Sequence, residues 1–137
     1  AALIETRALA SRAYVPESHF PVACVLETAH GRMIPGVNVE HPDWSFILCA
    51  ERNAIGTATS YGETEIRSLY VSCIYDATAT PCGACRQVIA ELAPDARLWM
   101  ERGEARAEMY RPDDLLLGSF SGEAILAGRT DKHSDRD

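Results

Sequence analysis

The chain has 137 residues, of which 47% are hydrophobic and 24% charged, and these values are typical of a globular domain with its own core. Its formal net charge of −7 disfavours a nucleic-acid polymer as partner, because binding one depends on a basic surface. No apolar run approaches the ~20 residues that a membrane span needs. Residues 1–7 are not typical of a signal peptide, so we expect a cytoplasmic protein without membrane contact.

Strands and helices are predicted to alternate along the chain, because runs with helical spacing of apolar residues are interspersed with short β-rich runs. Gly62 ends one predicted helix and Pro94 ends another. The predicted elements are, in chain order, a helix over 3–13, a β-hairpin of strands 20–26 and 33–39, a helix over 49–60, a strand over 66–75, a helix over 82–92, strands near 96–100 and 105–110, and a helical turn over 113–117.

This alternation predicts an α/β sandwich in a single domain over residues 1–128. The first helix carries apolar side chains at a spacing that predicts one buried face. These side chains are Leu3, Ile4, Leu9, Ala10 and Ala13. Residues 129–137 are almost entirely polar, and we expect them to be disordered.

Five cysteines lie at positions 24, 49, 73, 82 and 85. Because the number is odd and we expect no secretory signal, a disulfide framework is disfavoured and metal binding or catalysis is favoured. Cys24 and Cys73 lie in apolar predicted strands, and we interpret both as core thiols.

The other three cysteines belong to two short motifs, Cys-Ala-Glu at 49–51 and Pro-Cys-Gly-Ala-Cys at 81–85. Cys82 and Cys85 are three residues apart, so they share one helix face and can bind the same ion. Each motif falls where a helix is predicted to begin, and the positive end of a helix favours thiolate, the form that zinc binds. We therefore predict one Zn²⁺ per chain, held by Cys49, Cys82 and Cys85.

Glu51 is the predicted catalytic residue. It lies two residues after Cys49, and on a regular helix these side chains point about 200° apart. They converge on one ion if Cys49 is the first helical residue or lies just before it. Three protein ligands leave the fourth tetrahedral position to water, which is the catalytic arrangement.

Three thiolates around one Zn²⁺ leave an excess negative charge, which weakens the metal as a Lewis acid. Arg52 and Arg86 each follow a ligand cysteine closely, and we expect their charges to lower the pKa of the bound water.

A zinc site that only stabilises the fold is the alternative interpretation. Such a site needs a fourth protein ligand, for which Cys24, Cys73 or His41 are candidates. It also leaves Glu51 without a role beside the first ligand.

These motifs resemble the cytidine deaminase family, in its small form with a three-cysteine zinc site, over roughly residues 10–126. The zinc motifs match those of zinc deaminases in general. Ser-His-Phe-Pro-Val at 18–22 and Gly-Val-Asn-Val-Glu at 36–40 extend the resemblance and point to a nucleoside. The resemblance implies a three-layer α/β/α sandwich with a mixed five-stranded sheet. It also implies hydrolysis of cytidine or deoxycytidine to uridine or deoxyuridine and ammonia, in pyrimidine salvage.

The same resemblance implies roles for substrate-binding residues. Asn38 and Glu40 would bind the ribose 3′-hydroxyl, Phe20 would pack on the pyrimidine and the Ala50 backbone would orient the base. Glu51 would move a proton from the attacking water to N3 of the base and then to the leaving amine. A buried amide and carboxylate suit a sugar hydroxyl, because a substrate without one leaves them unpaired. The alternative is that Asn38 and Glu40 are merely polar residues at a hairpin end.

A homotetramer with shared active sites is also implied, in which Trp44 and Phe120 would reach a neighbouring subunit and bind the substrate there. Ordinary core packing is the alternative for both. A histidine at position 41 is unusual for cytidine deaminases, and in this respect the chain resembles the related blasticidin-S deaminases. It is either a hydrogen-bonding loop residue or a substrate contact, and the presence of Glu40 favours ribose. Two other functions therefore stay open: deamination of another aminated heterocycle or nucleoside antibiotic, and a non-catalytic zinc module.

Overall fold

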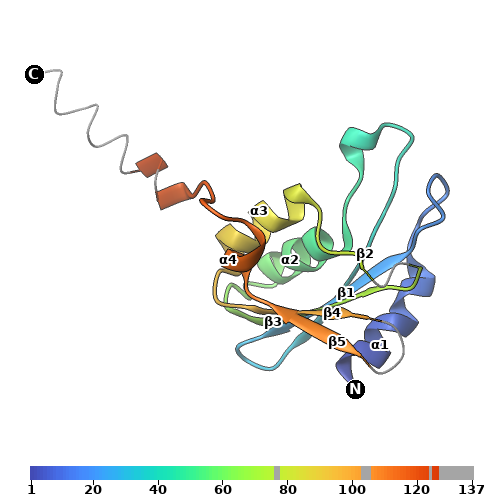
Figure 1. Ribbon diagram of the computed structural model, residues 1–137, viewed down its shortest axis with the longest axis horizontal. Helices are drawn as coiled ribbons and strands as arrows, with labels where there is room; N and C mark the ends of the chain where they lie inside the picture. Colours follow the sequence, from blue (N-terminus) through green and yellow to red (C-terminus); the bar gives the residue numbers. More distant parts are fainter. Residues whose placement is uncertain (76–77, 103–105, 124, 127–137) are drawn as a thin grey trace, which may run out of the picture.

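The computed structural model describes residues 1–75, 78–102, 106–123 and 125–126. These residues form one mixed sheet with the strand order β2-β1-β3-β4-β5 (Figure 1). The strands are β1 (Val22–Thr28), β2 (Met33–Val37), β3 (Ile66–Cys73), β4 (Arg97–Glu101) and β5 (Ala107–Tyr110). Strand β1 is antiparallel to β2 and β3, β3 and β4 are parallel, and β4 and β5 are antiparallel. The expected mixed five-stranded sheet is confirmed.

Helices cover both faces of this sheet. They are α1 (Ala2–Leu9), α2 (Ala50–Ser60), α3 (Gly83–Leu92) and the short α4 (Pro112–Leu115). Helix α1 packs on β1 and β3 from one side, whereas α2 packs on β1 and β2 from the other side and contacts α3 (Figure 1). This layering confirms the α/β/α sandwich. In the described part of the chain, no helix combines the length and apolar character that crossing a bilayer requires.

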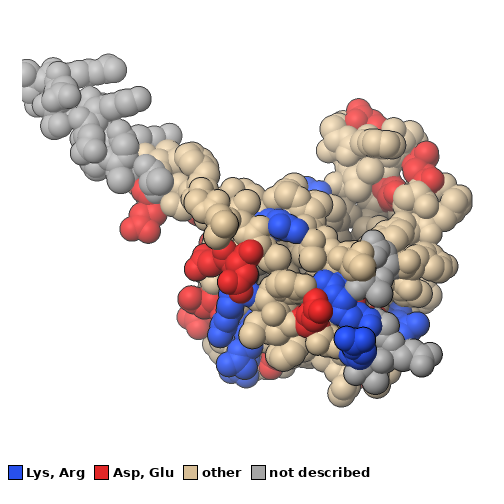
Figure 2. Space-filling model, viewed as in Figure 1, with Lys and Arg blue, Asp and Glu red and all other residues tan. Residues whose placement is uncertain are grey.

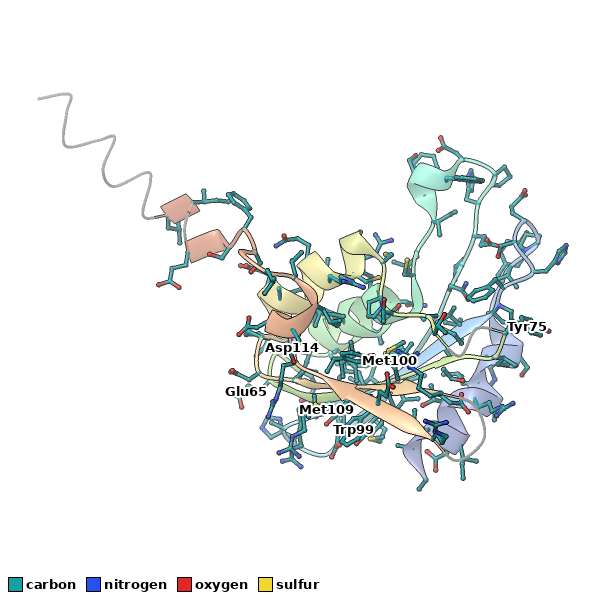
Figure 3. The ribbon with its side chains drawn as sticks, in the orientation of Figure 1. Glu65, Tyr75, Trp99, Met100, Met109 and Asp114 are labelled. Atoms are coloured by element: carbon teal, nitrogen blue, oxygen red, sulfur yellow. The ribbon has the colours of Figure 1, made fainter. Side chains whose placement is uncertain are left out.

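The alternation of side chains along β4 shows how the core is divided between the two faces. Leu98 and Met100 are buried in the cluster that contains the apolar side chains of α2 and α3. In Figure 3, Met100 lies on the α2 side of the sheet, whereas Trp99 and its strand partner Met109 lie on the opposite side. Even-numbered residues of β4 therefore face the helices that carry the predicted metal ligands.

The ends of the strands differ by up to two residues from the sequence prediction. Strand β1 begins at Val22, because Pro21 has no N–H to donate to the sheet. Strand β2 ends at Val37, and Val39 forms only isolated bridges beyond it. The predicted disorder of 129–137 lies outside the described residues.

The predicted apolar face of the first helix is wrong at Ile4, which is 75% exposed. Thr6 is buried instead, and its hydroxyl donates to the carbonyl oxygen of Ala2 at 2.7 Å. Because this bond satisfies the hydroxyl within the helix, threonine can occupy the buried position without an unpaired polar group. Ala10, which begins the short 3-10 turn η1 (Ala10–Arg12), is buried as predicted.

Gly36 allows α2 to approach β2 closely. A Cβ at this position would lie 2.9 Å from the Cβ of Ala54 and even closer to the backbone of Ala50 and Ala54. We expect Gly36→Ala to lower the free energy of unfolding by about 3 kcal/mol, because backbone atoms cannot move aside as a flexible side chain would. Urea denaturation followed by circular dichroism measures this loss.

Gly56, within α2, provides the matched control. A Cβ there meets nothing within 4 Å, so Gly56→Ala should be neutral or stabilising by up to about 1 kcal/mol. Equal effects of the two substitutions would contradict the close approach at Gly36.

Candidate active site

The beginnings of α2 and α3 bring the three predicted metal ligands together. Cys49 is the N-cap of α2, with φ −72° and ψ 154°, and Cys82 is the N-cap of α3, with φ −63° and ψ 166°. Cys85 lies in the first turn of α3, where its backbone N–H donates to the Cys82 sulfur at 3.4 Å. Cys49 thus occupies the position just before the helix that its convergence with Glu51 requires.

The sulfur atoms of Cys49, Cys82 and Cys85 lie within 4.8 Å of one another. The Cys49 and Cys82 sulfurs are 3.7 Å apart, which is too far for a disulfide. Two sulfurs bound tetrahedrally to zinc at about 2.3 Å lie about 3.8 Å apart, so the donor set fits Zn²⁺. Among the described residues, no further histidine, cysteine or carboxylate completes this cluster as a fourth member.

Arg52 lies in the first turn of α2, the helix that Cys49 precedes as N-cap, and its side chain contacts a ligand sulfur. Its guanidinium donates to the Cys49 sulfur at 3.2 Å and to the carbonyl oxygen of Ile47 at 3.3 Å. A hydrogen bond from Cys85 lowers the pKa of the Cys49 thiol most, and Arg52 lowers it further against the effect of partial burial, to about 5. Cys49 is therefore a thiolate at neutral pH, the form that binds zinc.

Glu51 is a buried carboxyl group beside the thiols. Glu51 is only 5% exposed, and the Cys85 thiol donates to its Oε2 at 3.7 Å. Burial raises the pKa of the Glu51 carboxyl above its ordinary value, and the charge of Cys49 raises it further. A carboxyl whose pKa is raised toward neutrality is suited to accept and return protons.

The thiols and Glu51 line a cavity of about 170 Å³. The cavity lies between the beginnings of α2 and α3, the beginning of β1 at Val22 and the end of β3 at Cys73. Its lining residues are Phe20, Val22, Asn38, Cys49, Ala50, Glu51, Cys73, Ala79, Thr80, Cys82 and Cys85. Of the four residues expected to contact a nucleoside within their own subunit, Phe20, Asn38 and Ala50 therefore line the same cavity as the thiols.

The fourth residue, Glu40, lies outside this lining and holds the neighbouring loop. Its Oε1 accepts N–H bonds from Ser18 at 3.1 Å and Glu17 at 3.3 Å. Burial opposes ionisation of Glu40, but these hydrogen bonds hold its pKa below the ordinary value. Asn38 is likewise engaged, since it accepts from Val22 N–H at 2.8 Å and donates to the Phe20 carbonyl at 2.9 Å.

Trp44 and Phe120 do not line the cavity and do not pack in the core. Trp44 is 78% exposed and Phe120 is 65% exposed. Trp44 lies in the 3-10 turn η2 (Trp44–Phe46), on an arm that projects from the body of the molecule (Figure 1). Core packing within the described chain, the alternative expected for both residues, is therefore wrong.

His41 and Arg86 hold loops. His41 Nδ1 accepts the Asp43 N–H at 2.9 Å, and its ring packs edge-on against Phe46 at 5.1 Å between centroids. Arg86 donates to the carbonyl oxygens of Pro81 at 2.7 Å and Leu115 at 2.9 Å and to the Thr80 hydroxyl at 2.6 Å. The hydrogen bonds of Arg86 thus hold the segment that precedes Cys82, while those of Arg52 reach a ligand sulfur.

Sequence reasoning missed part of the cavity wall. Cys24 is a core thiol as predicted, but Cys73 is only half-buried and lines the cavity. Ala79 and Thr80 also line it, and the signal that could have placed them is their position just before Pro81 and the ligand Cys82.

The charge on the molecular surface is mixed. On the face shown in Figure 2, arginines are interspersed with acidic side chains and form no continuous basic stripe. This distribution agrees with the net charge of −7 and offers no track for a phosphate backbone on that face.

A buried glutamate beside three cysteines at two helix N-termini, on an α/β/α sandwich, defines the class of zinc-dependent deaminases. The family model described as the cytidine and deoxycytidylate deaminase zinc-binding region matches residues 2–100. The chain belongs to this family.

Relatives and solved structures agree with this assignment. A cytidine deaminase of Halalkalibacterium halodurans is 36% identical over 112 residues, which cover 81% of this chain and 85% of the relative. A cytidine deaminase of Sporosarcina psychrophila is 35% identical, with coverage of 90% and 91%. The crystal structure of cytidine deaminase from Burkholderia pseudomallei has a TM-score of 0.82 and 31% identity, and the similarity covers 87% of this chain and 96% of that one.

The contact between Arg52 and the Cys49 sulfur leads to a prediction. We expect Arg52→Gln to keep one zinc per chain but to lower kcat about 10- to 100-fold, because the excess thiolate charge is then no longer offset. Metal analysis and steady-state ammonia release measure the two quantities. Arg67→Gln, which removes a 59% exposed arginine side chain, is the control and should leave both unchanged.

Proposed function

We propose that this chain catalyses zinc-dependent hydrolytic deamination of cytidine and deoxycytidine to uridine and deoxyuridine, with release of ammonia. The observation that carries the proposal is the buried Glu51 carboxyl beside three clustered thiols, in one cavity with Phe20 and Asn38. A zinc site that only stabilises the fold does not require a buried carboxyl with a raised pKa at this place.

Cys49, Cys82 and Cys85 hold the ion, which when bound supplies a Lewis acid that lowers the pKa of water. Glu51 accepts a proton from the attacking water and delivers it to N3 of the base, while a C4–O bond forms. Glu51 then moves the proton of the new C4 hydroxyl to the amino group. The C4–N bond breaks as the C4=O bond forms, and ammonia leaves. Burial keeps this carboxyl out of bulk solvent, so its protons are exchanged with substrate atoms.

The nucleoside is held by residues in and beside the cavity. Phe20 and Ala50 both line it, and in this proposal the Phe20 ring packs on the pyrimidine and the Ala50 backbone orients the base. Asn38 and Glu40 are proposed to bind the ribose 3′-hydroxyl. Both side chains are already fixed by backbone groups of the segment around Phe20, which supports a preformed sugar site.

We further propose a homotetramer, in which Trp44 and Phe120 reach the active sites of neighbouring subunits. Large apolar side chains that are mostly exposed, including Phe46 at 68%, support a subunit interface. We also propose that the enzyme acts in pyrimidine salvage and is located in the cytoplasm. Sedimentation equilibrium of the wild-type chain and of Trp44→Ala tests the assembly: the variant should dissociate.

A substrate panel tests the proposed reaction. The purified zinc-loaded protein is incubated with cytidine, deoxycytidine, cytosine, adenosine, guanine or blasticidin S, and ammonia release is measured with a chelator-treated control. We expect turnover of cytidine and deoxycytidine, and its loss after chelation. Turnover of blasticidin S or guanine alone would show that the substrate is not cytidine or deoxycytidine. No turnover of any compound would favour a non-catalytic zinc module.

A further inference from the structure

Arg102 is a mostly buried cation at the edge of the active-site cavity. It directly follows β4, and its side chain is only 11% exposed. Its guanidinium donates to the Ala79 carbonyl oxygen at 2.7 Å, to Glu108 Oε2 at 3.1 Å and to the Tyr110 hydroxyl at 3.2 Å. The cavity wall is thus connected to strand β5 through one side chain.

The direction of Arg102 follows from the strand register. Because side chains alternate between the two faces of a strand, residues 98, 100 and 102 share one face. Met100 lies on the α2 side of the sheet (Figure 3), so this is the face of Arg102 as well. Glu108 pairs with Met100 and Tyr110 pairs with Leu98, so both side chains share this face. Tyr110 also donates to Glu108 at 2.6 Å, and this bond fixes the carboxylate that orients the guanidinium.

The carbonyl that Arg102 holds belongs to the cavity wall. Ala79 and Thr80 line the cavity, immediately before Pro81 and the ligand Cys82. Arg86 holds the next part of the same segment through Thr80 and Pro81. Two guanidinium groups therefore hold consecutive residues of this wall: Arg102 at Ala79, and Arg86 nearer the metal ligand.

We propose that Arg102 is a positioning residue, which sets the Ala79–Thr80 wall of the cavity and through it the affinity for the nucleoside. This inference rests on the proposed function for the identity of the substrate. The hydrogen bonds of Arg102 go to Ala79, Glu108 and Tyr110, whereas Cys49 and Glu51 are hydrogen-bonded by Arg52 and Cys85, so these groups keep their own supports without Arg102. Its loss should weaken substrate binding more than it slows the chemical steps.

The test compares Arg102→Met, Arg102→Lys and the control Arg97→Met, which removes an exposed arginine at the other end of β4. We expect Arg102→Met to raise KM for cytidine about tenfold, with kcat within about twofold and one zinc per chain retained. Arg102→Lys keeps a cation that can donate to the Ala79 carbonyl, and its KM should lie between those of the wild type and Arg102→Met. Arg97→Met should match the wild type.

Hydrogen–deuterium exchange of the peptide that contains Thr80 gives a readout that needs no turnover. Faster exchange in Arg102→Met than in Arg97→Met is the expected result. An unchanged KM, a parallel loss of zinc, or equal exchange in the two variants would overturn the positioning role. A wild-type protein that releases no ammonia from cytidine would contradict the proposed function instead, and the exchange comparison would still decide whether Arg102 sets the wall.

Discussion

Glu51→Gln should lower kcat for cytidine about 10³-fold while the protein keeps its zinc and its fold. The amide has nearly the shape of the carboxylate but cannot accept the proton of the attacking water. The cavity contains no second described carboxyl group that could replace it. Ammonia release, metal analysis and circular dichroism on the same preparation measure the three quantities.

Glu65→Gln is the matched control for this substitution. Glu65, labelled in Figure 3, is exposed and immediately precedes β3, whose opposite end at Cys73 lines the cavity, so its variant should retain wild-type turnover. A Glu51→Gln or Glu51→Ala enzyme that kept a tenth of wild-type activity would contradict the role assigned to this carboxyl.

Cys85→Ser should remove both metal and activity. Cys85 is 1% exposed and clusters with Cys49 and Cys82, so its loss leaves two thiols and an incomplete coordination sphere. We expect less than about 0.1 zinc per chain and a decrease of about 4 kcal/mol in the free energy of unfolding, the contribution of a ligand present at about a thousand times its Kd. Urea denaturation with and without a chelator measures the decrease.

Cys24→Ala separates this effect from the general loss of a buried thiol. Cys24 lies in the hydrophobic core and is not one of the three clustered thiols. Burial raises the pKa of its thiol well above the ordinary value, so the thiol stays protonated. The variant should keep one zinc per chain and lose only about 1 kcal/mol of stability. Equal zinc loss in the two variants would contradict the assigned ligand set.

The metal cluster could be predicted from the sequence because each of its halves is a short motif at the beginning of a helix, and the resemblance to zinc deaminases joined the two halves across 33 residues. The spacing of Cys82 and Cys85 predicts a shared helix face. The need for Cys49 and Glu51 to converge predicts that Cys49 is the first helical residue or lies just before it, and the structure has Cys49 as the N-cap. The alternation of helices and strands similarly predicted the layers of the sandwich. Most element ends are in error by one or two residues, but α1 ends at Leu9 rather than at residue 13 and is followed by the 3-10 turn η1.

The parts that sequence reasoning missed depend on contacts between distant segments. The bond between Arg102 and the Ala79 carbonyl spans 23 residues, and no motif marks Arg102. Burial of Thr6 in place of Ile4 depends on an intrahelical hydrogen bond that hydrophobic periodicity ignores. The half-burial of Cys73 follows from its position at the end of β3, where the sheet opens into the cavity.

X-ray absorption spectroscopy at the zinc edge tests most directly whether the thiols form an open catalytic site. The structure predicts zinc with three sulfur neighbours and one lighter ligand atom in the wild type, and zinc loss in Cys85→Ser. Four sulfur neighbours, or a purified active protein without zinc, would contradict the site.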